Sequence, residues 1–184
     1  MTAPKHFTPV EFLRECFDYD PETGLFRWRV RPEHHFVSPR GRTAWNARFA
    51  GRAAFAHTTS HGYPSTNLTL PGGEKLQILA HRAAWALVAG EHCLGRIDHR
   101  DNDFSNSKFG NLRPATPSQN SGNRRSRPDK LKGAFWDAEH GRYRAIITVA
   151  GKRTHLGRFD TEEQAHAAYV KAAVDGFGEF ARAA

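Results

Sequence analysis

Residues 97–120 read IDHRDNDFSNSKFGNLRPATPSQN, and this stretch says most about the fold. Apolar residues at Ile97 and Leu112 lie in two short runs that predict strands over 95–99 and 111–113, joined by a polar loop. Thr116 then supplies an N-cap, Pro117 fits the first helical position, and Gln119 completes a capping box. The segment therefore predicts a strand, a loop, a second strand and a helix.

Four polar residues of this unit have side chains suited to phosphodiester chemistry: Asp98, His99, Asn111 and Asn120. Asp98 and Asn120 offer the oxygen ligands that a hard divalent cation prefers. His99, with an unperturbed pKa of about 6.5, can accept a proton from water. Asn111 is placed to fix the loop beside His99. The alternative is structural, because a lone histidine is commonly a core residue and asparagine favours turns and caps.

The spacing of these residues resembles the HNH endonuclease motif of phage-type homing endonucleases. The shared pattern comprises His81, Arg82, Trp85, Gly90, Ile97, Asp98, His99, Asp101, Asn106, Asn111, Leu112, Arg113, Ala115, Thr116, Gln119 and Asn120. The resemblance implies a ββα-metal unit with His99 as general base, Asn111 as the orienting residue, and Asp98 and Asn120 as ligands of one Mg²⁺ or Mn²⁺ ion. The turn at residues 18–24 also resembles the leader of such phage proteins. Residues 107–109 depart from the pattern, which concerns the loop and not the ligands.

Before this unit, the sequence predicts a helix over 9–17, with Thr8 as cap and Glu11 completing a capping box. Hairpins are expected over 18–31 and over 63–79 with its turn at 71–73, followed by a helix over 80–89 that ends at Gly90. No regular structure is assigned to the basic residues 32–50.

After the unit, the sequence predicts strands over 133–137, 142–149 and 152–159, then a helix capped by Asp160 with Glu163 at its third position. Alternation places Tyr143, Ala145 and Ile147 toward that helix. One helical face is expected to pack on the sheet, formed by Ala165, Ala168, Tyr169 and Ala172.

This last part resembles the DNA-binding domain of plant ethylene-response factors, through Leu156-Gly157-x-Phe159 and the string from Glu163 to Tyr169. The resemblance implies a sheet that lies in the DNA major groove, with Arg142, Arg144, Arg153 and His155 facing out. For the three arginines, the alternatives are phosphate contact or plain solvation. Ile146 and His155 differ from that family, so its base preference does not carry over.

Positive charge is concentrated beside this domain. The chain has a formal net charge of +8, and residues 121–158 alone hold ten Lys/Arg against three Asp/Glu. Such a strip suits a polyanion, and nucleic acid is the commonest one. The basic linker over 121–131 carries Arg124, Arg125 and Arg127 and is followed by Lys132, which makes all four candidates for DNA contact. A flexible, solvated tether is the alternative.

Composition excludes several other classes of protein. No apolar run is long enough to span a membrane, and residues 1–10 lack the pattern of a secretory signal. The two cysteines, Cys16 and Cys93, exclude a disulfide scaffold and a four-cysteine zinc site. We expect a cytoplasmic protein, and a phage protein inside a host cell if the family resemblance holds.

The predicted fold class is α+β, divided into an N-terminal region (1–79), an HNH unit (80–120), a linker (121–131) and a DNA-binding domain (132–184). The predicted function is metal-dependent hydrolysis of double-stranded DNA by a monomer that nicks one strand. Two alternatives differ in class. One is a DNA-binding regulator with a vestigial HNH unit, and the other is a general RNA or chromatin binder acting through charge alone.

Overall fold

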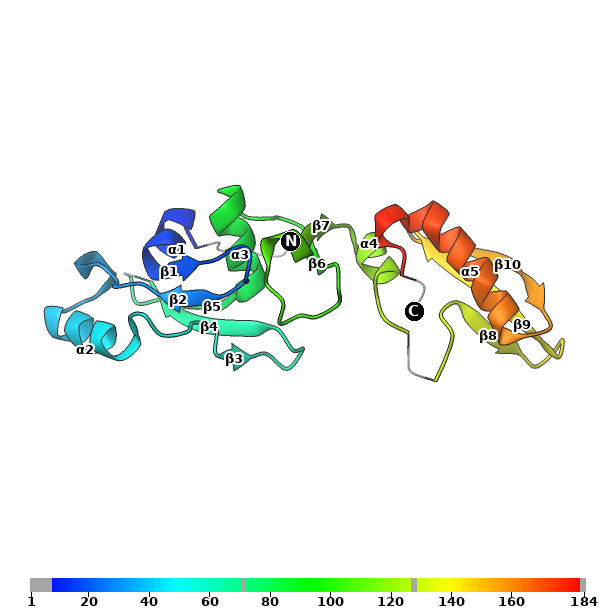
Figure 1. The fold of residues 1–184 in the computed structure, drawn as a ribbon, viewed down its shortest axis with the longest axis horizontal. Coiled ribbons are helices and arrows are strands. Elements are labelled where there is room, and N and C mark those ends of the chain that lie inside the picture. Colours follow the sequence, from blue (N-terminus) through cyan, green and yellow to red (C-terminus); the bar gives the residue numbers. More distant parts are fainter. Residues whose placement is uncertain (1–7, 71, 127–128, 183–184) are drawn as a thin grey trace. The chain divides into compact units, whose positions relative to one another are not determined.

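The computed structural model describes residues 8–70, 72–126 and 129–182 (Figure 1). The chain divides into two compact units, Met1–Arg113 and Pro114–Ala184. Both contain helices and strands, which confirms the α+β class. The four-part division expected from the sequence stays a prediction. Among the described residues, no helix combines the length and hydropathy needed to cross a membrane.

The first unit is built from short elements (Figure 1). They are α1 (Val10–Cys16), β1 (Phe17–Tyr19), β2 (Phe26–Trp28), a 3₁₀ turn (Glu33–His35), α2 (Pro39–Phe49), β3 (His57–Thr58), β4 (Pro64–Thr69), β5 (Lys75–Leu79), α3 (Ala80–Ala89), β6 (Arg96–His99) and a second 3₁₀ turn (Phe109–Asn111). β1 pairs with β2, β4 lies between β3 and β5, and β6 pairs with β7 (Leu112–Ala115). The pairings of β1 with β2 and of β4 with both its neighbours are antiparallel.

Aromatic rings form the centre of the first unit. Phe17 lies 4.7 Å from Trp28 and 5.0 Å from Phe55, measured between ring centroids, and all three are buried. α1 adds Leu13 and α3 adds the small residue Ala84, both completely or almost completely buried. Large rings bury much apolar area per residue, so a core of this kind can hold a unit with few long elements. Both cysteines are free thiols.

Two helix ends test the capping predictions. α3 ends as expected, because Gly90 follows it in the left-handed conformation with φ of 77°. The capping box expected at α1 is wrong: the helix begins at Val10, Pro9 is its N-cap, and no side chain caps it. The start lies one residue later than expected, so Thr8 falls outside the capping position.

The expectation that residues 32–50 have no regular structure is also wrong, because α2 occupies Pro39–Phe49. Ser38 accepts a hydrogen bond from the Gly41 amide at 3.2 Å, and Pro39 takes the first helical position. That Ser-Pro signal was present in the sequence. The arginines and Gly41 concealed it, since they leave no continuous apolar stripe.

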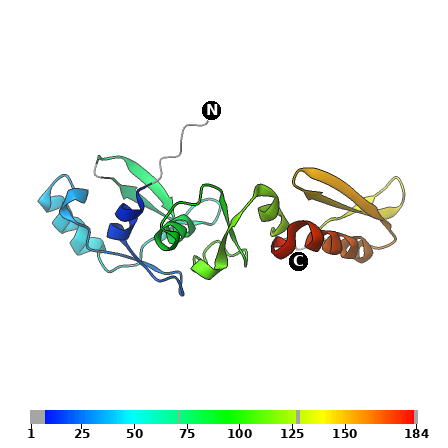
Figure 2. The same ribbon diagram turned by 90° about the horizontal axis from the view of Figure 1, so that it is seen from above.

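The second unit contains α4 (Pro117–Gly122), β8 (Ala134–Asp137), β9 (Arg142–Val149), β10 (Lys152–Phe159), α5 (Glu162–Phe177) and a 3₁₀ turn (Gly178–Phe180). β9 lies between β10 and β8, and both pairings are antiparallel. α5 runs along one face of this sheet (Figure 2). Ala145 and Ile147 are buried there with Ala165 and Tyr169 of the helix, which confirms the predicted direction of both β9 residues.

Two further helix starts lie in this unit. The capping box of α4 is confirmed, since the Thr116 side chain accepts from the Gln119 amide and Gln119 accepts from the Thr116 amide. The Asp160 cap of α5 is wrong, because Thr161 caps that helix by accepting from the Gln164 amide at 3.3 Å. Asp160 forms an ion pair with Arg142 instead.

Gly133 is required where the chain enters β8. Its φ is +79°, and a Cβ there would lie 2.0 Å from Cδ2 of Tyr169. We expect Gly133→Ala to cost about 1–2 kcal/mol for the left-handed backbone and about 1–3 kcal/mol more for overpacking. Hydrogen exchange of α5 amides would report this loss in the second unit alone.

Gly151→Ala is the matched control for this prediction. Gly151 has a φ of +81° in the same unit, and a Cβ added there would meet nothing within 4 Å. The control should therefore show only the backbone cost. Equal effects of the two variants would contradict the argument from the Tyr169 contact.

Candidate active site

β6 places Asp98 and His99 next to each other in a buried position. Ile97, Asp98 and His99 are all buried, and His99 is the last residue of the strand. Successive residues of a strand point to opposite faces, so only the end of the strand lets both polar side chains lie in one neighbourhood. Because His99 ends the strand, Asp98 and His99 can belong to one site.

Aromatic rings surround the His99 imidazole. Its centroid lies 6.0 Å from Tyr63, 5.1 Å from His81 and 5.7 Å from Phe104, the last two edge-on. Burial lowers the pKa of His99, while the carboxylates of Asp101, Asp98 and Asp103 act in the opposite direction. A histidine with a lowered pKa is neutral at neutral pH and can accept a proton.

His81, on α3, is the second buried histidine of this cluster and had no role assigned from sequence. It is 5% exposed, and its Nδ1 has no hydrogen-bond partner among the described residues. Burial, followed by the His99 charge, lowers the pKa of His81 to about 3. The ring is therefore uncharged in the folded protein over most of the pH range.

This burial predicts a loss of stability in acid. Between about pH 3 and the unfolded value of about 6.5, the unfolded chain binds a proton at His81 that the folded chain does not. The free energy of unfolding should therefore fall as pH drops through this window. His81→Phe keeps a ring but cannot titrate, so its pH dependence should be shallower by up to about 1.4 kcal/mol per pH unit.

Urea unfolding at several pH values, followed by tryptophan fluorescence, measures this difference. His61→Phe, which makes the same exchange at an exposed position of the same unit, is the control against which the effect of His81→Phe is compared. Parallel profiles for the wild-type chain and His81→Phe would contradict the assignment of acid sensitivity to His81.

Asn111 fixes the loop that follows His99. Its Nδ2 donates to Oδ1 of Asp101 and to the carbonyl oxygen of Asn106, each at 3.0 Å. Its Oδ1 accepts from the Asp101 amide at 3.1 Å, and its backbone carbonyl accepts from the Arg100 amide. Asn111 thus ties both ends of the loop together immediately beyond His99. Asp101, a half-buried residue of the shared pattern, is a loop partner to which the sequence assigned no role.

Asp98 lies in a buried ion pair with Arg113. The Nε atom of Arg113 donates to Oδ2 of Asp98 at 2.9 Å, and the side chains of Arg113 and Asp98 are 7% and 5% exposed. A carboxylate has lone pairs on both oxygens, so the contact with Arg113 does not by itself exhaust its capacity as a ligand. The oxygen chemistry fits a hard divalent cation, although Arg113 already neutralises part of the charge.

Asn120 lies on α4, in the second unit, and is half-buried. Asp98, His99 and Asn111 all lie in the first unit. The assignment of Asn120 as a metal ligand continues to rest on the sequence spacing.

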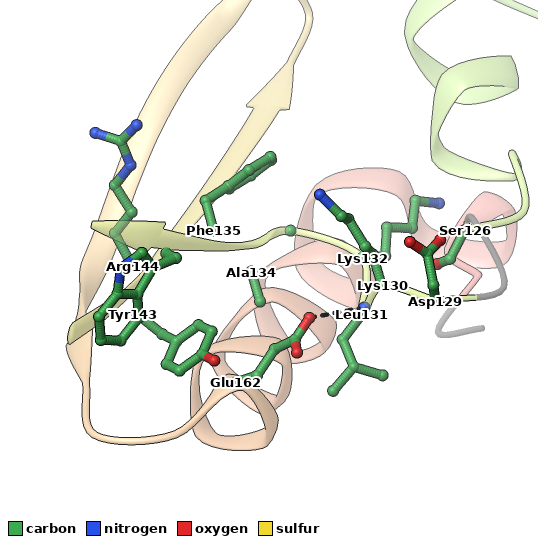
Figure 3. A pocket seen from close by; sticks show the side chains of 12 residues that line it. Ser126, Asp129, Lys130, Leu131, Lys132, Ala134, Phe135, Tyr143, Arg144 and Glu162 are labelled. Carbon is green, nitrogen blue, oxygen red and sulfur yellow. Dashed lines mark hydrogen bonds between the residues drawn. The ribbon is translucent and has the colours of Figure 1, made fainter. Parts of the chain in front are cut away.

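The sheet of the second unit carries four of the predicted DNA-contacting residues, Arg142, Arg144, Arg153 and His155, on the face away from α5. The register pairs His155 with Ile146 and Arg153 with Thr148, and these four residues share that outer face. Arg144 pairs with Phe135 of β8, and both side chains project from the same side in Figure 3. Arg142 is ion-paired with Asp160 at 3.1 Å.

A pocket of about 690 Å³ opens beside this face at the start of β8 (Figure 3). Phe135 is 50% exposed there, and the buried Nε of Arg144 has no hydrogen-bond partner among the described residues. On the other side, Glu162 accepts from the Leu131 amide at 3.1 Å and holds the pocket wall to α5. The pocket thus combines an exposed ring with an arginine head group.

Lys132 differs from the other predicted phosphate contacts. Its ammonium group donates to the carbonyl oxygens of Gly122 at 2.5 Å, Arg124 at 2.9 Å and Arg182 at 3.5 Å. It also lies 5.8 Å from the Tyr169 ring centroid, and burial lowers the pKa of Lys132 to about 8. In this conformation Lys132 holds the linker to the C-terminal segment. Arg124 and Arg125 are exposed, and Arg127 lies outside the described residues.

Two groups of side chains elsewhere in the described ranges could hold a metal ion: Glu15, His34 and His35, and Asp137, Glu139 and His140. In the first, Glu15 Oε2 lies 2.6 Å from His35 Nε2, and Arg31 Nε donates to His35 Nδ1 at 3.1 Å. Because arginine only donates, Nδ1 must accept and Nε2 must carry the proton. That tautomer suits a hydrogen bond to Glu15 and not a metal ion. In the second, Asp137 is already bound to Arg158.

One curated relative matches part of the chain. A protein of Acanthamoeba polyphaga mimivirus, described as an uncharacterized HNH endonuclease, is 39% identical over 85 residues. This likeness supports a nuclease of the HNH type. The match covers 46% of this chain and 44% of the viral protein. No family model matches the chain, and no solved structure matches it significantly.

Proposed function

We propose that the chain is a metal-dependent HNH endonuclease that hydrolyses phosphodiester bonds of double-stranded DNA. The observation that carries this proposal is the buried, neutral His99 imidazole at the end of β6, adjacent in sequence to a carboxylate and followed by a loop that Asn111 fixes. The likeness to an HNH endonuclease supports the same reaction class.

His99 acts as the general base. Its neutral ring nitrogen takes a proton from water, the water oxygen forms a bond to phosphorus, and the bond from phosphorus to the 3′ oxygen breaks. Tyr63, His81 and Phe104 limit the rotation of the imidazole through their ring contacts. Asn111 keeps the following loop in place, which preserves the position of the base.

Asp98 and Asn120 are the proposed ligands of one Mg²⁺ or Mn²⁺ ion. When bound, such an ion stabilises negative charge on the phosphate and on the leaving oxygen. One site cuts one strand, so the proposed product of a monomer is a nick. We also propose that the protein is cytoplasmic and that it is a phage protein acting inside a host cell.

The C-terminal sheet is the proposed source of site preference. Arg144, Arg153 and His155 lie on the face opposite α5, which is the face that an ethylene-response-factor-like domain would turn toward the major groove. Arg142, Arg124, Arg125 and Arg127 are proposed to contact phosphates. Lys132 is proposed to support them by holding the linker, since its ammonium already binds carbonyl oxygens.

A supercoiled-plasmid assay tests the proposal. Open-circle product that requires Mg²⁺ or Mn²⁺ and disappears with EDTA is expected. A regulator with a vestigial HNH unit would bind a duplex tightly and specifically without cutting it, and a general RNA or chromatin binder would show a steep salt dependence without sequence preference.

A further inference from the structure

A second basic region lies in the first unit, apart from the basic strip over 121–158. Residues 27–52 contain seven arginines and one acidic residue, Glu33. None of this charge belongs to the proposed active site or to the C-terminal sheet. The structure shows which of these arginines are engaged within the protein and which face solvent.

Four of the seven bond within the protein. Arg27 donates to the carbonyl oxygen of Gly51 at 3.1 Å, and Arg29 donates to that of Arg14 at 3.3 Å. Arg31 is 4% exposed, lies 4.9 Å from the Trp45 ring centroid, and donates to the carbonyl oxygen of Thr69 at 3.1 Å. Arg42 is ion-paired with Glu33 at 3.0 Å, which uses the one acidic group of the region. The remaining positive charge therefore has no compensating carboxylate within residues 27–52.

α2 orients part of that charge outward. Its inner face is anchored by Trp45, which packs edge-on against Trp28 at 5.1 Å, and by Asn46, which exchanges two hydrogen bonds with the backbone of Arg31. The opposite face carries Arg40, Ala44, Ala47 and Arg48, at the spacing of neighbours on one side of a helix. All four are exposed.

Arg52 follows the helix and is also exposed. Within the described ranges, neither Arg40 nor Arg52 has an ion-pair partner, and Arg48 lies over the Phe49 ring at 5.1 Å. We define Arg40, Arg48 and Arg52 as the α2 arginine surface. Both ribbon views show α2 at the end of the first unit away from β6 (Figures 1 and 2).

We propose that the α2 arginine surface contacts the phosphate backbone of duplex DNA, on a stretch separate from the phosphate at His99. This inference rests on the proposed function, which supplies DNA as the partner. Guanidinium groups pair with phosphate oxygens through two parallel hydrogen bonds, a geometry that lysine lacks. Ala44 and Ala47 are small, so a backbone can approach the helix between the arginines.

The chemistry of this face favours a polyanion over a membrane. Its exposed helical positions carry proline, arginine, glycine, threonine and alanine, and none carries a large apolar side chain that could enter lipid. The contact gives no base readout. It adds affinity that is independent of sequence and sensitive to salt.

The test is the salt dependence of binding to a duplex in EDTA, so that cleavage does not interfere. The variant carries Arg40→Gln, Arg48→Gln and Arg52→Gln together. Each lost phosphate contact lowers the slope of log K against log salt by about 0.9, so we expect a reduction of about 2.7. The matched control carries Arg14→Gln, Lys75→Gln and Lys171→Gln, which removes the same charge from other exposed positions and should change the slope little.

A lysine version of the triple variant separates charge from folding. Arg40→Lys, Arg48→Lys and Arg52→Lys should restore most of the slope. An equal change in the glutamine variant and the control, or no binding of duplex DNA by the wild-type chain, would overturn the inference. The glutamine variant could show the reduced salt slope while the wild-type chain binds DNA but does not cleave it. That result would support the inference and contradict the proposed nuclease function.

Discussion

His99→Ala is expected to reduce the rate of metal-dependent nicking by about 10²–10⁴-fold, the usual contribution of a general base. The imidazole is the group that takes the proton from water, and its burial keeps it neutral. Alanine provides no acceptor at that position. The rate of conversion of supercoiled plasmid to open circle, with Mg²⁺ or Mn²⁺ in excess, measures the effect.

His99 is also a packed residue, so the experiment must separate catalysis from folding. Its ring contacts Tyr63, His81 and Phe104, and removal leaves a cavity among them. His99→Gln keeps more of the volume and should be equally slow. Duplex binding in EDTA should persist in both variants, since neither removes a proposed phosphate contact.

His57→Ala is the matched control, because His57 is an exposed histidine on β3 of the same unit. It should nick at the wild-type rate. His99→Ala could instead nick at the full rate with Mg²⁺ or Mn²⁺ and show no nicking in EDTA. That result would show that His99 is not the general base, and the assignment of the whole site would lose its support.

Local signals in the sequence predicted some elements well. The capping box at Thr116 and the glycine after α3 are confirmed because both depend on backbone groups within one helical turn. α2 was missed although Ser38 and Pro39 mark its start. Its inner face mixes Arg42 and Asn46 with Trp45 and Phe49, so apolar periodicity could not reveal it.

The burial of charged side chains could not be predicted from the sequence. Nothing local distinguishes Arg31 and Arg113, which are buried, from Arg40 and Arg52, which face solvent. Arg31 bonds to Thr69, which is 38 positions away in the chain, and Arg113 bonds to Asp98, which is 15 positions away. The same holds for His81, whose closeness to His99 depends on the packing of α3 against the end of β6.

Arg113→Met is expected to lower the free energy of unfolding of the first unit by about 3–5 kcal/mol, the usual cost of removing one partner of a buried ion pair. Methionine fills much of the arginine volume, so the loss comes mainly from the Asp98 carboxylate, which would be left buried without its guanidinium. Urea unfolding followed by tryptophan fluorescence measures the change. Arg96→Met, at an exposed position on β6, is the control and should change stability little.

The double variant Asp98→Asn with Arg113→Met tests whether the loss arises from that carboxylate. Removing both charges should recover a large part of the stability, because no buried charge is then left unpaired. The single variants Asp98→Asn and Arg113→Met are measured beside it. If the double variant loses as much stability as the two single variants added together, the pair is not coupled and another group must hold the Asp98 carboxylate.

The same series connects the ion pair to the proposed metal site. In Arg113→Met the carboxylate is free of its cation, so a divalent ion that binds Asp98 in the folded chain should stabilise that variant more than the wild type. Added Mg²⁺ should therefore recover stability in the single variant and not in the double variant, which has no carboxylate at position 98. Equal Mg²⁺ effects in both variants would show that the stabilising ion binds elsewhere, and Asp98 would then be a structural partner of Arg113 and not a ligand.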